Sequence, residues 1–324
     1  MRAWLPERVV TGPFPVTMPD VRELNHLFAE SFTDRYRRDG LVGVRVPELN
    51  PRVWEYALLD AGPGAMLWRD EHGAIAAFNI AHRCGTEGWM GPLAARIDRQ
   101  GSGLGKTIVR AAIDWLIAEG ATTVGLETMP RTVENIGFYA RLGFLPGHLT
   151  VTMSQDLAVR RRASGAPPVL SRLAPAEQER AVAAARELVS SLVGGSDFTR
   201  EILLTAEVGL GDTTLVWDGP TLTAMVLWHT ASLAADRGSE ELRVLKLVAR
   251  DADALEAALA AVEGSAAGLS LRRVSVRCQT GYAGAFRALV TRGYQVRWTD
   301  LRMSLDGYPE RQASGGILFS NWEI

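Results

Sequence analysis

The stretch Arg99-Gln100-Gly101-Ser102-Gly103-Leu104-Gly105-Lys106-Thr107 decides how we interpret this chain. It follows an apolar run, residues 89–97, that predicts a strand, and it precedes a periodic segment, residues 108–117, that predicts a helix. A glycine-rich turn at a helix N-terminus presents bare backbone amides and about half a positive charge to an anion. Glycine also permits positive φ angles and close approach of a ligand to the backbone. The stretch therefore predicts a phosphate or pyrophosphate site.

The spacing of the glycines distinguishes three phosphate-binding patterns. A Walker A loop would need glycine at position 100, which is Gln100, and the dinucleotide pattern G-x-G-x-x-G would need it at Lys106. Gln100, Gly103 and Gly105 instead fit Gln/Arg-x-x-Gly-x-Gly/Ala. This is the pyrophosphate loop of the GNAT (Gcn5-related N-acetyltransferase) superfamily, which the segment resembles.

Two further motifs strengthen the resemblance. Leu126-Glu127-Thr128 looks like the Leu-Glu-Val of the fifth GNAT strand, and residues 138–144, FYARLGF, look like the superfamily's FYxxLGF signature. The resemblance implies an α/β (α+β) fold with a mixed, mostly antiparallel sheet that splays into a V-shaped cleft between flanking helices. Pro92, which lacks an N–H, suits a bulge in the strand beside this cleft. The resemblance also implies an acetyl-CoA-dependent N-acetyltransferase that transfers the acetyl group directly to a primary amine, without a metal.

The resemblance assigns catalytic roles to two residues. Tyr139 matches the superfamily tyrosine that reaches the CoA sulfur, so it is the expected general acid. Glu127 lies on the strand that lines the cleft and is the expected general base, directly or through water. His82 is a competing base, ranked lower because the equivalent His229 stands in a part of the chain that we expect to be inactive.

The resemblance also assigns the residues that bind acetyl-CoA. Residues of the strand beside the cleft would pair with the pantetheine arm, and residues of the glycine-rich stretch would hold the pyrophosphate. The family's usual asparagine, seven residues before the tyrosine, is replaced by Thr132, and Asn135 stands nearby. The expected cofactor-binding residues are Leu93, Ala94, Ala95, Gln100, Gly101, Ser102, Gly103, Leu104, Gly105, Lys106, Thr132 and Asn135.

The second part of the chain repeats the first. Gly143-Phe144 matches Gly293-Tyr294, and Met153-Ser154 matches Met303-Ser304, both at an offset of 150 residues. The predicted helices and strands also recur in the same order. We therefore expect two tandem copies of one fold, with a front domain at 1–157, a linker at 158–168 and a rear domain at 169–324.

The same offset predicts that the rear copy has lost the site. Gly101 and Gly103 fall on Asp251 and Asp253, whose carboxylates would repel a pyrophosphate, and Tyr139 falls on Leu289. The rear copy is then expected to cover the front sheet or to extend the acceptor pocket. The apolar tail, residues 316–322, is expected to dock on a sheet edge or on a second subunit.

The composition of the chain excludes several classes of function. The net charge of −2 provides no basic field for nucleic acid, and no run of apolar residues is long enough to cross a membrane. Two isolated cysteines and five histidines show no metal-ligand spacing. The residues at the N-terminus contain no apolar signal segment. These features predict a soluble cytoplasmic protein, either a monomer with an internal pseudo-dimer or a homodimer.

Three functions remain open on the sequence alone. The first is N-acetyltransfer to an amine of an unidentified small molecule or peptide. The second is a non-catalytic acyl-CoA-binding or sensor protein whose rear copy contacts a partner. The third is a nucleotide-binding protein that uses Gly105-Lys106-Thr107. The acceptor itself cannot be identified from these motifs.

Overall fold

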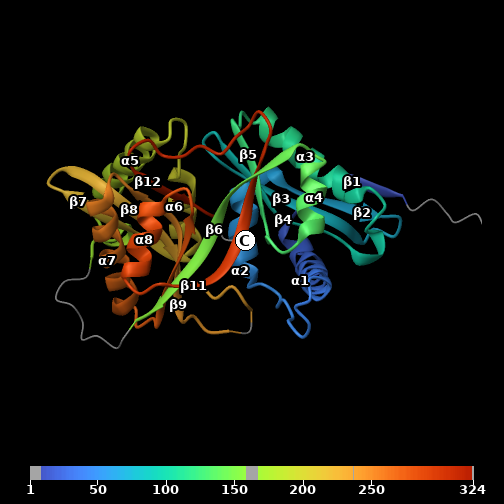
Figure 1. Cartoon of the computed structure of the whole chain (residues 1–324), viewed down its shortest axis with the longest axis horizontal. Coiled ribbons are helices and arrows are strands. Elements are labelled where there is room, and N and C mark those ends of the chain that lie inside the picture. Colours follow the sequence, from blue (N-terminus) through green and yellow to red (C-terminus); the bar gives the residue numbers. More distant parts are fainter. Residues whose placement is uncertain (1–8, 158–166, 236, 323–324) are drawn as a thin grey trace, which may run out of the picture.

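The computed structural model describes residues 9–157, 167–235 and 237–322 (Figure 1). Most of the expected linker, residues 158–166, lies outside this part of the chain. The front half opens with strand β1 and then alternates helices and strands. Its elements are β1 (Val10–Pro15), α1 (Val21–Arg38), α2 (Pro51–Ala61), β2 (Ala65–Asp70), β3 (Ile75–Cys84), β4 (Glu87–Ala95), α3 (Leu104–Ala118), β5 (Thr123–Thr128), α4 (Val133–Ala140) and β6 (Phe144–Asp156).

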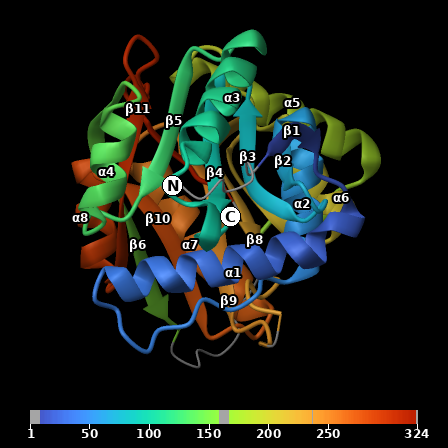
Figure 2. The same cartoon turned by 90° about the vertical axis from the view of Figure 1, so that its right-hand side faces the viewer.

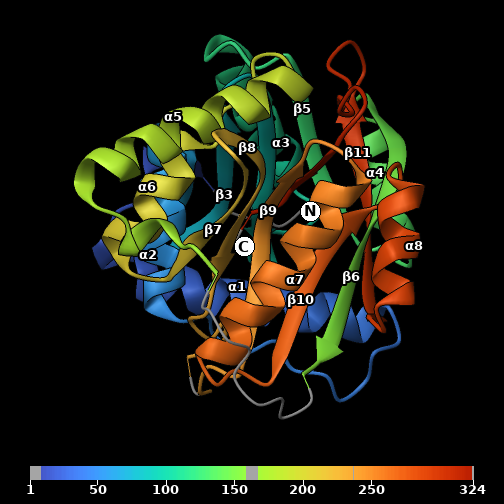
Figure 3. The same cartoon turned by 90° about the vertical axis from the view of Figure 1, so that its left-hand side faces the viewer.

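The rear half repeats this order from α1 onward and adds one strand at its end. Its elements are α5 (Pro175–Leu192), α6 (Thr199–Val208), β7 (Gly211–Asp218), β8 (Thr221–His229), β9 (Glu241–Ala249), α7 (Ala252–Gly268), β10 (Arg273–Gln279), α8 (Ala283–Thr291), β11 (Gln295–Leu305) and β12 (Ile317–Ser320). The order of elements in the front half thus recurs in the rear half, as the offset of 150 residues predicts. Both halves are mixed, mostly antiparallel sheets flanked by helices (Figures 1 and 3).

The two halves share one twelve-stranded sheet, because they exchange their last long strands. The order is β1-β2-β3-β4-β5-β11-β6-β10-β9-β8-β7, with β12 beside β9. Strand β11 of the rear half pairs with β5 of the front half, and β6 of the front half pairs with β10 of the rear half. β6 and β11 therefore run side by side through the centre of the molecule (Figure 1).

The repeated methionines show what this exchange does to the cores. Met303 is fully buried in the front core, beside Leu126 and Tyr139. Met153 is fully buried in the rear core, beside Val276 and Leu289. Each half therefore completes its hydrophobic core with a side chain from the other.

The sheet of the front half splays open between two parallel strands. β4 and β5 pair only from Glu87 to Met90 and from Thr123 to Leu126, and then diverge. Next to this point the register between β3 and β4 shifts, leaving Gly91 and Pro92 as a bulge. The expected bulge at Pro92 is confirmed, and the splay opens the cleft that the site uses.

The corresponding gap in the rear half is filled by the chain's own tail. β9 and β10 are parallel only up to Val244 and Val276. Beyond that point β12 pairs antiparallel with residues 246–249 of β9, and Phe319 is fully buried there. The expectation that the tail docks on a sheet is therefore confirmed within the chain itself.

Helix α1 bounds the front cleft. Its apolar positions, including Leu24 and Phe28, pack against β3 and β4, and the helix passes across the sheet near the end of β4 (Figure 2). In the rear half, α7 covers β8, β9 and β10 on one face, while α5 and α6 lie on the other (Figure 3).

Candidate active site

The glycine-rich loop leads directly into helix α3. Gly103 is the residue before the first helical turn and has φ 90°, and Gly101 has φ 77°. A Cβ at either position would meet no atom within 4 Å, so glycine is needed here for its backbone angle and not for space. Within the described residues, the amides of 101–105 donate no backbone hydrogen bond. Free backbone amides at the N-terminus of a helix can bind an anion, and the loop is therefore suited to a pyrophosphate.

The other residues of the loop contribute in different ways. The side chain of Ser102 donates to the carbonyl of Arg99 (2.6 Å), which ties the loop back to the preceding turn. Leu104 turns its side chain into the front core, so only its amide is available. Lys106 is exposed to solvent. Gly105 packs closely on Phe138, because a Cβ at this position would lie 3.4 Å from the ring.

A continuous channel leads from this loop into the molecule. A cavity of about 200 Å³ is lined by Ala94, Ala95 and Gln100, and Gln100 is held by a hydrogen bond to the Ala95 carbonyl (3.1 Å). A second cavity of about 380 Å³ lies deeper, over the splay of β4 and β5. The residues that line both cavities are Phe32, Arg35, Leu93, Asn135 and Tyr139.

Tyr139 stands at the junction of the two cavities. Its side chain is only 6% exposed, and burial raises the pKa of its phenol above the ordinary value of 10. The phenol is therefore protonated at neutral pH and can donate a proton or a hydrogen bond. The structure brings Tyr139 together with Asn135, Leu93 and Gln100, as expected.

Thr132 does not join them. Its side chain is fully buried and its hydroxyl donates to Asp39, so it lines neither cavity. The expected contact of Thr132 with the pantetheine arm is not supported, because its hydroxyl is already used inside the protein. Asn135, one helical turn later, is the amide that faces the channel.

Glu127 lines the deeper cavity but is bound in a network of ion pairs. It pairs with Arg277 of the rear half, Arg302 lies 3.7 Å away, and the Thr150 hydroxyl donates to it at 2.6 Å. Burial raises the pKa of Glu127, but the two arginines and the hydrogen bonds outweigh burial and lower it below the ordinary value of 4.5. A carboxylate stabilised in this way is a weak base, which argues against the expected role of Glu127.

His82 has the geometry of a base. Its Nδ1 lies 2.8 Å from a carboxylate oxygen of Asp60 on α2, and both side chains are at most 3% exposed. Its Nε2 is buried and has no hydrogen-bond partner among the residues that the structure describes, and the residue lines the deeper cavity. A histidine whose second nitrogen is fixed by a carboxylate is oriented to accept a proton at Nε2.

The equivalent histidine of the rear half has its Nε2 occupied. His229 contacts the hydroxyl of Thr205 through Nε2 (2.8 Å), whereas His82 contacts Asp60 through Nδ1. The nitrogen that His82 leaves for the cavity is therefore used inside the protein in the rear half.

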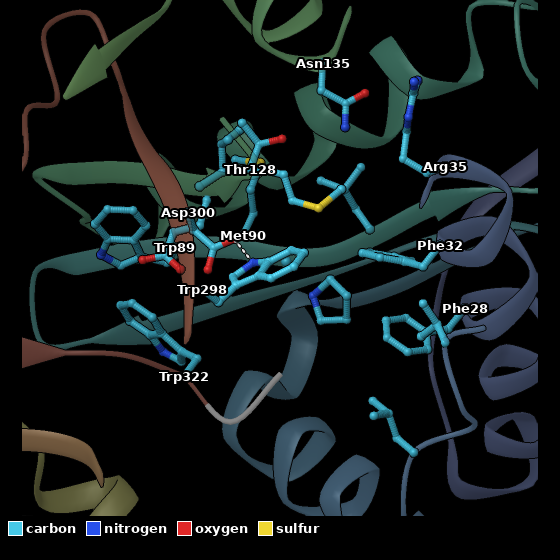
Figure 4. Close-up of a pocket in the computed structure, with 18 of the residues that line it drawn as sticks. Phe28, Phe32, Arg35, Trp89, Met90, Thr128, Asn135, Trp298, Asp300 and Trp322 are labelled. Carbon is cyan, nitrogen blue, oxygen red and sulfur yellow. Dashed lines mark hydrogen bonds between the residues drawn. The ribbon is translucent and has the colours of Figure 1, made fainter. Parts of the chain in front are cut away.

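The rear half also supplies part of the wall of the deeper cavity (Figure 4). Trp298 and Asp300 come from the exchanged strand β11, and the indole of Trp298 donates to Asp300 at 3.1 Å. Trp322, which follows β12, stacks near His82 with ring centroids 6.3 Å apart. The two ends of the channel are thus built differently: the loop end by the front half alone, the deep end by both halves.

The rear half has no counterpart of the loop. Asp251 caps helix α7, and its carboxylate accepts a hydrogen bond from the amide of Ala254 (2.8 Å). Where the front half has Tyr139, the rear half has Leu289, which is fully buried. One amide at the start of α7, that of Ala254, is therefore already used by the protein's own carboxylate.

Sequence comparison adds an independent observation. Residues 22–144 match the family model described as "Acetyltransferase (GNAT) family". This part of the chain is a GNAT domain. Members of this family are acyltransferases that use an acyl-CoA co-substrate, and the loop cradle and channel of this GNAT domain fit such a molecule. A search among curated proteins finds no significant match.

Solved structures agree on the fold of the whole chain. A putative acetyltransferase from Pyrococcus horikoshii covers 98% of this chain and 96% of its own, with 13% identity and TM-score 0.64. A GCN5-related N-acetyltransferase from Sphaerobacter thermophilus covers 94% and 97%, with 19% identity and TM-score 0.59. A tandem GNAT protein from the clavulanic acid biosynthesis pathway covers 94% and 100%, with 15% identity and TM-score 0.56. At these identities the similarity establishes the fold alone.

Beneath the deeper cavity of the GNAT domain lies a buried cluster of charged groups. Lys246 is 1% exposed, lies 3.6 Å from the carboxylate of Glu201 and donates to the hydroxyl of Ser320 (3.1 Å). Its ammonium also lies 3.9 Å from the ring of Trp322. Burial raises the pKa of Glu201 to about 7. The cluster ties α6, β9 and the tail together directly below the residues that stack on His82.

Two searches of the described residues were negative. No group of three or more histidine, cysteine, aspartate or glutamate side chains there is arranged to hold a metal ion. Among the helices of that part of the chain, none combines the length and the apolar character that a membrane span requires.

Proposed function

We propose that this chain is an acetyl-CoA-dependent N-acetyltransferase that transfers an acetyl group directly to a primary amine of a small molecule or peptide. One observation carries the proposal: the phenol of Tyr139 and the Nε2 of His82 line connected cavities that begin at Gln100, the residue next to the bare loop amides. An anion cradle at one end and a proton donor and acceptor further in are what thioester aminolysis needs.

The roles follow from the balance of the reaction. A bond forms between the amine nitrogen and the acetyl carbon, and the bond between that carbon and sulfur breaks. His82, held by Asp60, takes the proton that the amine loses, either directly or through one water. Tyr139 gives or shares a proton with the leaving thiolate. Cys84 and Cys278 are buried and lie outside the channel, which agrees with transfer that forms no acyl-enzyme.

In this proposal Glu127 is a positioning residue. It pairs with Arg277 on β10, which also donates to Asp300 on β11 at 3.0 Å, so it links β5 to β10 and to the exchanged strand β11. Its charge is balanced by the arginines and is not available to the amine.

The experiment measures release of free CoA thiol from acetyl-CoA over a panel of primary amines, with mass spectrometry of the acetylated product. Tyr139→Phe is compared with Tyr294→Phe, which removes another buried phenol, 3% exposed, from the rear half. We expect loss of turnover only in Tyr139→Phe, with the acetyl-CoA dissociation constant kept. Tight acetyl-CoA binding without turnover of any amine would instead favour a non-catalytic acyl-CoA sensor, and binding of ATP in place of acetyl-CoA would favour a nucleotide-binding protein.

A further inference from the structure

The deeper cavity is walled by aromatic rings from five separate segments of the chain. Helix α1, strand β4, helix α4, the exchanged strand β11 and the tail all contribute to it (Figure 4). The rings are those of Phe28, Phe32, Tyr36, Trp89, Tyr139, Trp298 and Trp322. Rings brought together from so many elements give a cavity of about 380 Å³ a largely aromatic wall, and this volume is within the usual size of a small-molecule site.

Trp298 is held in place and still offers a surface. Its Nε1 donates to Asp300 at 3.1 Å, which fixes the direction of the indole. Its ring centroid lies 6.0 Å from that of Tyr36, with the planes tilted by 35°. Yet 37% of the residue remains exposed, so part of the ring is available to another flat group.

The charged groups of this wall are already paired. Arg277 binds both Glu127 and Asp300, and Arg35 binds Asp39 (2.6 Å) and Glu134 (2.7 Å). His82 is held by Asp60. Within the part of the chain that the structure describes, an acceptor carrying a carboxylate or phosphate would find no unpaired cation in this wall, and its charge would lose hydration without compensation.

From these observations we propose that the acceptor is a primary amine with a flat, aromatic body that carries no negative charge, and that Trp298 and Tyr36 bind this body. The inference rests on the proposed amine acetylation and adds the substrate class. The amine points toward His82 and Tyr139, and the aromatic body lies toward the exchanged strand. The rear half, which has lost its own site, thereby determines which acceptor the front half uses.

The test uses pairs of amines that differ in one property. 2-Phenylethylamine and 2-cyclohexylethylamine are both apolar, but only the first is flat and has a π-face. Phenylalanine adds a carboxylate to the first. We expect kcat/KM for 2-phenylethylamine to exceed that for 2-cyclohexylethylamine by about three- to tenfold, which is typical of an aromatic contact beyond its buried area. Phenylalanine is expected to be the poorest of the three.

Variants of Trp298 test whether its ring causes the preference for the flat amine. Trp298→Leu should abolish the preference through a higher KM for the flat amine, with the acetyl-CoA dissociation constant unchanged, and Trp298→Phe should keep part of it. Trp217→Leu is the matched control, because Trp217 is also 37% exposed but lies on β7. Tyr36→Leu tests the second ring if the Trp298 variants fail to fold.

The outcomes separate this inference from the proposed function. Acetylation with equal kcat/KM for flat and saturated amines, or a preference that survives Trp298→Leu, would overturn the aromatic acceptor and leave the acetyltransferase intact. Binding of acetyl-CoA with no acetylation of any amine would overturn the proposed function, and this inference with it.

Discussion

Replacing Asp60 by asparagine tests the proposed base most directly. Asparagine keeps the size of the side chain and an oxygen that accepts from Nδ1 of His82, but it removes the negative charge. In the wild type that charge lies 2.8 Å from the imidazole, and both side chains are shielded from water. When His82 takes the proton of the amine, the carboxylate stabilises the charge that develops on the ring.

The size of the effect follows from the distance. With charge centres about 4 Å apart and an effective dielectric constant of about 20, the interaction is about 4 kcal/mol. Asp60→Asn removes this interaction only in the state in which the proton has moved to His82. The variant is therefore expected to lower kcat by about 10²–10³-fold. The acetyl-CoA dissociation constant should not change, because Asp60 lies outside the loop end of the channel.

The assay measures CoA release under saturating acetyl-CoA with the best amine of the panel. His229→Gln in the rear half is the control, since it alters the equivalent histidine without touching the channel. Circular dichroism and the melting temperature check that each variant is folded. If Asp60→Asn and His82→Asn both turn over like the wild type, His82 is not the base and the amine proton leaves by another route.

Three further changes test other parts of the molecule. Tyr139→Phe should lower kcat by about 10²–10⁴-fold, as expected for loss of a general acid, and an unchanged kcat would remove Tyr139 from the reaction. Gly103→Ala should weaken acetyl-CoA binding, measured by calorimetry, because a Cβ at φ 90° costs about 1–2 kcal/mol. Gly73→Ala carries similar strain, at φ 82°, in a surface turn and should leave binding unchanged; equal effects would mean that the loop is not a ligand site. Glu201→Gln should flatten the pH dependence of stability. Since the pKa of Glu201 is raised from 4.5 to about 7, its contribution is present below pH 4.5 and is lost as the pH rises through 7, and chemical denaturation of both proteins across this range measures it. A slope that survives in the variant would show that another group causes it.

Local sequence signals predicted most of the elements. The apolar period and the glycines around it predict helices at 21–36 and 51–59 and a hairpin at 65–82, close to the observed α1, α2, β2 and β3. The period also predicts a helix over 253–262, whereas α7 continues to Gly268. Its last six residues, EGSAAG, are small or polar and include two glycines, so they show no apolar period and resemble a helix end.

The strand exchange could not be predicted in the same way. The offset of 150 residues showed that β6 and β11 are equivalent, but a repeat is equally consistent with two separate sheets and with one shared sheet. Which strand pairs with β5 depends on long-range contacts such as the burial of Met303 in the front core, and no local pattern encodes them. For the same reason the sequence did not indicate that Trp298 and Trp322 line a cavity of the other half.

The ion-pair partners of the site residues could not be predicted from the sequence either. Glu127 was the expected base because of its place on β5. Its carboxylate is a weak base because it pairs with Arg277, which is 150 residues away in the sequence. His82 was ranked lower because His229 also exists, and its orientation depends on Asp60, which lies on a helix of no recognisable motif. Both partners act through space and not through sequence spacing, so only the fold could assign them.

The filled gap in the rear half explains why one chain of two similar halves has one site. In both halves the parallel pair separates at an equivalent point, after Met90 in the front half and after Val244 in the rear half. An open gap leaves backbone groups of the diverging strand without partners, and burial of unpaired groups is costly. In the front half a ligand can satisfy them, whereas in the rear half β12 does so permanently, from Ile317 to Ser320. The same tail then carries Trp322 under His82, so closing the rear cleft and completing the front pocket are two results of one strand.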